Sequence, residues 1–158
     1  MIDGLMKKLL YLIIIALLTH ITVFHIEAGD IFSDYEKVIW INQVKQYGIA
    51  YENGKKLFQF PIITGDDEFT TDPGIYVVKV KDENYFSRKY DTPMPYSIFF
   101  DFKHRKAIHA GEVPPPDLKK DLATHGCIHV EHPYIERLYD WADEENTVVV
   151  IYGWRSDD

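Results

Sequence analysis

A succession of short β-forming runs, each closed by a turn signal, constrains the fold of this chain more than any other feature. The runs are rich in β-branched and aromatic residues, which favour strands. Asn53 and Gly54 separate two of the runs, and this pair accepts the positive φ angles of a two-residue hairpin turn. Pro61 then restricts the next residues to a sheet edge or a bulge. We expect strands at 38–44, 47–51, 57–60, 75–80, 96–102, 106–109 and 147–152.

One helix is expected late in the chain, over 133–145. Proline suits its first turn, and Ile135, Leu138 and Trp141 recur near helical spacing. A shorter helical stretch could begin at Asp117. The residues between Pro93 and Pro95 are expected to form a loop. No internal repeat or linker divides the chain, so the sequence predicts one mainly antiparallel β domain with one or two short helices.

The first 28 residues have the order of an export signal. Lys7 and Lys8 precede a short apolar run, and Ala28 offers a small residue for cleavage. Polar residues interrupt the run before it reaches the ~20 apolar residues that span a bilayer. We expect 1–28 to be a signal peptide or an N-terminal membrane anchor, rather than a core helix, and 29–158 to be one domain. Both a signal peptide and an anchor would place that domain outside the cytoplasm, in the periplasm or cell envelope.

The charge of the chain bears on its partners. The formal net charge is −8, whereas a nucleic-acid partner requires a clustered basic face. The sequence therefore predicts no nucleic-acid partner, and it gives no indication of oligomeric state.

Cys127 is the one cysteine of the chain, and it lies beside histidines in Thr-His-Gly-Cys-Ile-His at 124–129. A disulfide within the chain needs a second sulfur, so four roles remain: an inert buried thiol, a metal ligand, an intermolecular bridge or a nucleophile. Histidine and cysteine can hold zinc, but the spaced cysteine pairs of structural zinc sites are absent. The residues alone leave these roles open.

The spacing of the histidines suits nucleophilic chemistry. If a strand begins near Gly126, alternation along it places His125, Cys127 and His129 on one face. His109 ends another expected strand and could approach the same face. A thiol with a pKa of ~8.5 is mostly protonated at neutral pH, so a neighbouring imidazole is needed to remove its proton. The glycine would let backbone N–H groups approach a developing oxyanion.

The segment from His109 to His129 resembles the active-site segment of the YkuD-type L,D-transpeptidases. The pattern of that family is a histidine, a gap of about fifteen residues and then Ser/Thr-His-Gly-Cys. Here fourteen residues separate His109 from Thr-His-Gly-Cys at 124–127. The similarity covers 37–152. It includes three further stretches, 61–65, 72–76 and 94–100.

The resemblance implies a β-sandwich that acts on peptidoglycan stem peptides without a metal or an organic cofactor. It makes Cys127 the nucleophile that attacks a stem carbonyl and expels the terminal D-alanine, after which an amine resolves the thioester. It makes His109 the general base, oriented by a backbone carbonyl near Ala110. The resemblance implies a substrate and oxyanion site lined by Thr124, His125, Gly126, His129 and Ala110.

Two residues depart from the family pattern. Ala110 stands where the family commonly has glycine, and His129 stands where it usually has arginine. Arginine is a permanent forked cation, whereas histidine is mostly neutral at pH 7. His129 is therefore either a reader of a substrate carboxylate or a surface histidine without that duty. Three functions stay open: a transpeptidase, a hydrolase that uses water in place of the amine, and a wall-binding domain that has lost activity.

Overall fold

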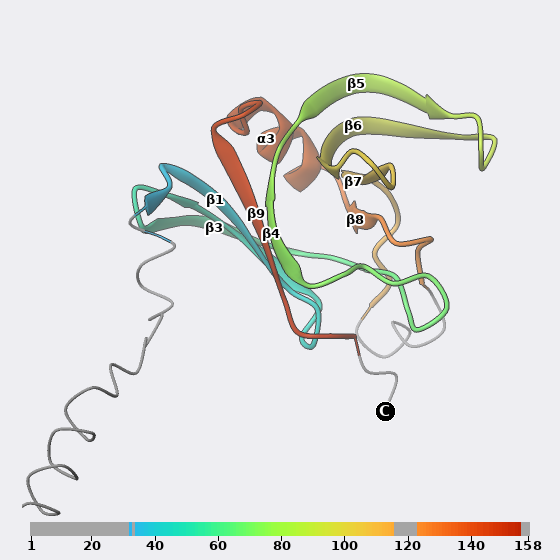
Figure 1. Ribbon diagram of the computed structural model, residues 1–158, viewed down its shortest axis with the longest axis horizontal. Coiled ribbons are helices and arrows are strands. Elements are labelled where there is room, and N and C mark those ends of the chain that lie inside the picture. The colour runs from blue at the N-terminus through green and yellow to red at the C-terminus, as the bar shows by residue number, and fades with distance from the viewer. Residues whose placement is uncertain (1–31, 33, 116–122, 156–158) are drawn as a thin grey trace, which may run out of the picture. The chain divides into compact units, whose positions relative to one another are not determined.

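The computed structural model describes residues 32, 34–115 and 123–155 (Figure 1). The predicted export segment at 1–28 and the helical stretch predicted to begin at Asp117 lie outside these residues. Among the residues described, no helix has the length and apolar character needed to cross a membrane.

The described chain forms two β-sheets and one helix, with the sheets drawn as separate layers in Figure 1. A five-stranded sheet has the order β3-β2-β1-β9-β4, and a four-stranded sheet has the order β5-β6-β7-β8. The strands of the first sheet are β1 (Lys37–Asn42), β2 (Tyr47–Glu52), β3 (Lys55–Pro61), β4 (Gly74–Val77) and β9 (Thr147–Tyr152). The second sheet contains β5 (Val80–Ser87), β6 (Thr92–Asp101), β7 (Lys106–Ala110) and β8 (Ile128–Val130). The helix α3 spans Tyr134–Trp141.

Most neighbouring strands run antiparallel, while β1 pairs with β9 and β7 pairs with β8 in parallel. The predicted mainly β sandwich is therefore confirmed. Strand β9 lies between β1 and β4 inside its sheet, as expected for a run of branched apolar residues. The hairpin between β2 and β3 is also confirmed, because Asn53 and Gly54 have φ angles of 49° and 72° and Glu52 pairs with Lys55 across the turn.

The main core is built from both sheets and from α3. Ile39 of β1 pairs with Val149 of β9, and Ile41 pairs with Ile151. Because side chains alternate along a strand, these four face the same side. The core residues contributed by the second sheet and the helix are Ile98, Phe100, Ile108, Ile128, Val130, Ile135 and Leu138.

Two stretches of the second sheet differ from the prediction. β5 continues to Ser87 through a polar segment, and this segment has no apolar run that would predict a strand. Pro93 and Pro95, expected in a loop, lie inside β6. They pair with β5 alone, since the pairing of β6 with β7 begins at Ile98. Proline has no N–H to donate, but the backbone nitrogens of these two residues can face the side of β6 that has no partner strand there.

The helix is shorter than predicted. It ends at Trp141 rather than near Glu145, because Ala142 has extended backbone angles. The Asp143 N–H is then bonded to the Thr147 hydroxyl at 2.7 Å instead of to a helical carbonyl. This contact leads the chain directly into β9.

Gly48 of β2 stands directly opposite Phe60 of β3. A Cβ atom at residue 48 would lie 2.4 Å from Phe60 Cε2 and 3.1 Å from Ile41 Cδ1, and the Phe60 ring is fully buried. We expect Gly48→Ala to lower the free energy of unfolding by about 1–3 kcal/mol through overpacking, as measured by urea denaturation. Combined with Phe60→Leu, it should cost less than the sum of the two single changes. Simple additivity would show that the collision is not the cause.

Candidate active site

The parallel pairing of β7 with β8 brings the predicted site residues together. His109 of β7 is in register with His129 of β8, and their imidazole rings meet edge to face with centroids 4.6 Å apart. Cys127 immediately precedes β8. Two segments that are distant in sequence thus contribute a thiol and two imidazoles to one end of the four-stranded sheet.

A cavity of about 460 Å³ opens over these residues. It is lined by Tyr90, Thr92, Pro93, Met94, His109, Ala110, Gly111, Ala123, Thr124, His125, Cys127 and His129. Of the predicted site residues, Gly126 alone does not line it. The sequence analysis assigned no site role to the residues that the β5–β6 hairpin contributes, because no chemical motif marks them, although Met94 belongs to one of the stretches that resemble the family.

The turn that carries Cys127 is fixed by hydrogen bonds and by one glycine. Thr124 Oγ1 accepts a bond from the Gly126 N–H at 3.2 Å and donates one to the Cys127 carbonyl at 2.5 Å. Gly126 has a φ of 91°, and a Cβ atom there would lie 2.8 Å from the Thr70 carbonyl oxygen. Its own carbonyl accepts a bond from Thr71 Oγ1 at 3.1 Å. A side chain at this position would push the turn away from the 70–72 segment.

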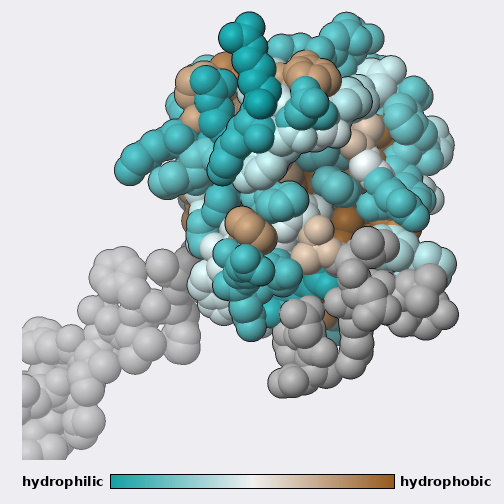
Figure 2. Space-filling model, turned by 90° about the vertical axis from the view of Figure 1, so that its right-hand side faces the viewer, coloured by the Kyte–Doolittle hydropathy of each residue, from teal (hydrophilic) through white to brown (hydrophobic). Residues whose placement is uncertain are grey.

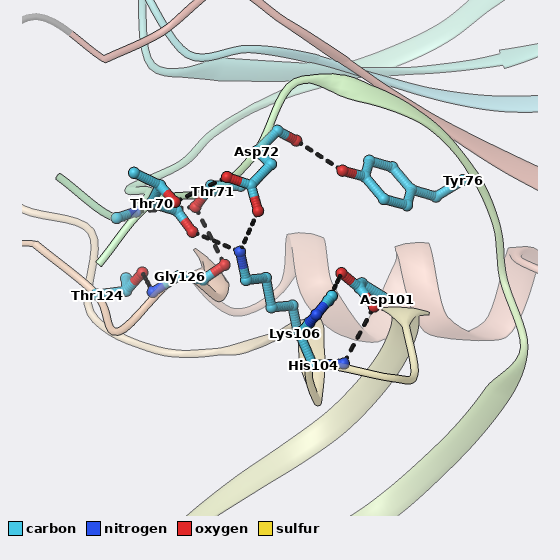
Figure 3. Close-up of polar contacts among 10 residues, drawn as sticks. Thr70, Thr71, Asp72, Tyr76, Asp101, His104, Lys106, Thr124 and Gly126 are labelled. Carbon is cyan, nitrogen blue, oxygen red and sulfur yellow. Dashed lines mark hydrogen bonds and ion pairs between the residues drawn. The ribbon is translucent and has the colours of Figure 1, made fainter. Parts of the chain in front are cut away.

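A half-buried lysine holds the same segment from the other side (Figure 3). Lys106 Nζ donates to the Thr70 carbonyl at 2.7 Å and to Asp72 Oδ2 at 2.6 Å. Thr70 Oγ1 donates to Asp72 Oδ1 at 2.7 Å. The hydrogen bonds from Lys106 and then from Thr70 hold the pKa of Asp72 below its usual range. The sequence analysis gave Lys106 no role, since a lysine that starts a strand carries no motif.

His109 is buried and oriented by the backbone. Its Nδ1 lies 2.8 Å from the Ala110 carbonyl oxygen, the contact that the family resemblance implied. A carbonyl can only accept, so Nδ1 carries the proton and Nε2 keeps a free lone pair. Burial first, and then the nearby His129, lowers the pKa of His109 to about 4. At neutral pH the ring is therefore uncharged and able to accept a proton.

The Cys127 thiol is also neutral in the resting site. Burial raises its pKa, and the backbone N–H of Ala107 and the charge of Lys106 oppose that rise only in part. The pair consequently rests as a thiol and a neutral imidazole, not as a thiolate and an imidazolium.

The two remaining histidines have different surroundings. His129 packs over Gly111, where a Cβ atom would lie 2.5 Å from its Cγ, and burial lowers its pKa. It is half-buried and lines the cavity, and its role as a reader of a substrate carboxylate stays a prediction. His125 is exposed at the rim, stacked on Tyr90 at 4.6 Å and edge-on to Phe69 at 4.7 Å between ring centroids. Within residues 34–115 and 123–155, no group of three His, Cys, Asp or Glu side chains is arranged to hold a metal ion.

The L,D-transpeptidase catalytic domain model, YkuD, matches residues 36–151. The chain belongs to this family. No protein among the curated sequences matches it.

Several solved structures have the same fold. An L,D-transpeptidase from Stackebrandtia nassauensis is 24% identical with a TM-score of 0.69, over 78% of this chain and 58% of that one. A cysteine-to-serine mutant of the Enterococcus faecium L,D-transpeptidase is 22% identical with a TM-score of 0.65, over 74% and 50%. Mycobacterium tuberculosis L,D-transpeptidase 3, with a faropenem-derived adduct, is 16% identical with a TM-score of 0.63, over 75% and 60%. The chain thus matches only half to three-fifths of the length of these proteins.

The charge of Lys106 opposes the effect of burial on Cys127. We expect Lys106→Met to raise the pKa of the Cys127 thiol further, and Lys106→Arg to preserve it. The pH dependence of alkylation by iodoacetamide, followed by mass spectrometry, reports this pKa because the thiolate is the reactive form. An unchanged midpoint in Lys106→Met would show that the lysine acts on the fold of the 70–72 segment and not on the thiol.

Proposed function

We propose that this chain is a peptidoglycan L,D-transpeptidase in which Cys127 is the nucleophile and His109 the general base. The observation that carries the proposal is the state of His109. Its Nδ1 is engaged by the Ala110 carbonyl at 2.8 Å, and it lines the same cavity as Cys127. Nε2 is thus left to exchange a proton with a thiol or an amine in that cavity.

The reaction has two halves. In the first, His109 Nε2 takes the thiol proton while Cys127 Sγ attacks the stem carbonyl, and backbone N–H groups of the 124–127 turn stabilise the oxyanion. The imidazolium then gives that proton to the departing amine of D-alanine, which leaves a thioester. In the second half, the imidazole takes a proton from an acceptor amine as the amine attacks the thioester. The free thiol is restored when the proton returns to sulfur.

The relatives and the N-terminal segment support this assignment. One structure of the Enterococcus faecium protein has a cysteine replaced by serine, and the Mycobacterium tuberculosis protein carries a faropenem-derived adduct. Both facts are consistent with a family that works through an acylated cysteine. We further propose that residues 1–28 export or anchor the domain, since peptidoglycan lies outside the cytoplasmic membrane.

The direct test is incubation of the protein with purified tetrapeptide muropeptides, with products followed by mass spectrometry. We expect loss of D-alanine and formation of dimers, both abolished in Cys127→Ala because no thioester can form. Cysteine-dependent cleavage without dimers would replace the transpeptidase by a hydrolase. If the protein binds muropeptides without turning them over, the result would favour a wall-binding domain that has lost activity.

The pH profile tests the role of His109. The base must be neutral, and its folded-state pKa is about 4 instead of the usual 6.5, so kcat/KM should fall only as the pH drops through about 4. His129→Gln should move this acid limb upward, because the neighbouring His129 helps to depress the pKa of His109. An acid limb near pH 6.5 in the wild type would contradict a buried, neutral general base.

A further inference from the structure

A second cavity, of about 610 Å³, meets the first at the nucleophile. Tyr90, Met94, His125 and Cys127 line both cavities. From there the second cavity extends toward the turn at 88–91, between β5 and β6, and the turn at 102–105, between β6 and β7. Its other lining residues are Tyr85, Phe86, Ser87, Arg88, Lys89, Lys103, His104 and Arg105.

The second cavity is strongly basic although the chain has a net charge of −8. Arg88, Lys89, Lys103 and Arg105 line it, and none of its other lining residues in the described part of the chain is an aspartate or glutamate. The five ion pairs among the described residues involve none of these four cations. A group of cations that has no carboxylate partners and lies beside the proposed nucleophile is suited to bind an anionic ligand.

Two of the cations are held near aromatic rings. Lys89 Nζ lies 4.8 Å from the centroid of the Tyr90 ring, and the Arg105 guanidinium lies 5.1 Å from that of Phe102. The Arg105 carbonyl oxygen is 4.0 Å from Cys127 Sγ, so this turn reaches the nucleophile itself. Hydrophilic side chains surround a few hydrophobic ones on the face toward which the β5–β6 hairpin extends (Figure 2).

Proton transfer assigns the two cavities to different parts of the reaction. His109 protonates the leaving amine and deprotonates the acceptor amine, so both amines must use the cavity that His109 lines. Among the described residues that line that cavity there is no lysine, arginine, aspartate or glutamate. The acyl part of the donor stem, joined to Cys127 Sγ, then extends into the other cavity, where the four cations lie.

We propose that the basic cavity binds free carboxylates of the donor stem peptide, and that the protein selects stems whose acidic groups are not amidated. This inference rests on the proposed function. The inference concerns the choice of donor stem and not of acceptor, because the basic turns line the cavity assigned to the acyl part of the donor. Charge-assisted contacts from arginine and lysine to carboxylates distinguish an acid from its neutral amide.

The test compares two synthetic tetrapeptide donors that differ only in having free or amidated acidic groups. We expect wild-type kcat/KM to favour the free acid by about tenfold, the effect of losing a few exposed charge contacts. Arg88→Gln with Lys89→Gln and Lys103→Gln should remove most of the preference, and so should raised salt, which screens charges. A control variant, Lys55→Gln with Lys56→Gln, removes two charges from the edge strand β3 and should keep the preference.

Binding to Cys127→Ala, measured by calorimetry, separates this inference from the function. If both donors acylate wild-type Cys127 and both bind equally well, the carboxylate site is wrong and the transpeptidase stands. If neither donor acylates or binds, the proposed function fails together with the inference. Single Arg88→Gln provides a milder variant, and urea denaturation of every variant verifies folding. A preference that survives both the charge removal and high salt would overturn the assignment.

Discussion

Gly126 approaches the Thr70 carbonyl so closely that no side chain could stand at its position, and the geometry of the site depends on this approach. The turn brings Cys127 to the end of β8, beside the strand that carries His109. Lys106 completes the link, because its ammonium group binds the Thr70 carbonyl and the Asp72 carboxylate. Cys127 is thus positioned by loops from both sheets, and the sandwich holds those loops together.

Burial sets the charge of His109 and Cys127 in the absence of substrate. Desolvation lowers the pKa of His109 and raises that of Cys127, so both groups are neutral when no substrate is bound. A neutral thiol is less prone to alkylation and oxidation than a thiolate. In the proposed reaction, a developing oxyanion would balance the charge that forms on the imidazole. The two groups would then ionise during attack and not before it.

The sequence predicted a mainly β domain and the hairpin at Asn53 and Gly54 through strand propensity and positive φ, and its resemblance to the family implied the sandwich and the grouping of Cys127 with His109. It did not predict the turn at 124–127, because β8 begins only at Ile128 and side-chain alternation therefore does not place His125 beside Cys127. It did not predict the polar strand β5 or the prolines inside β6, because sheet pairing there overrides local preference. It also missed Lys106 and the basic turns, whose roles arise from tertiary contacts between distant segments.

Gly111 leaves room for the histidine at residue 129, where the family usually has arginine. The imidazole occupies the space that any side chain at residue 111 would need, and it contacts His109 edge to face. A permanent arginine charge so close to His109 would depress the pKa of the base further than a neutral histidine does. The cationic groups of this protein lie instead on the two turns of the second cavity. In the proposed reaction, the charge that would bind an anion is thereby separated from His109, the residue that would move the proton.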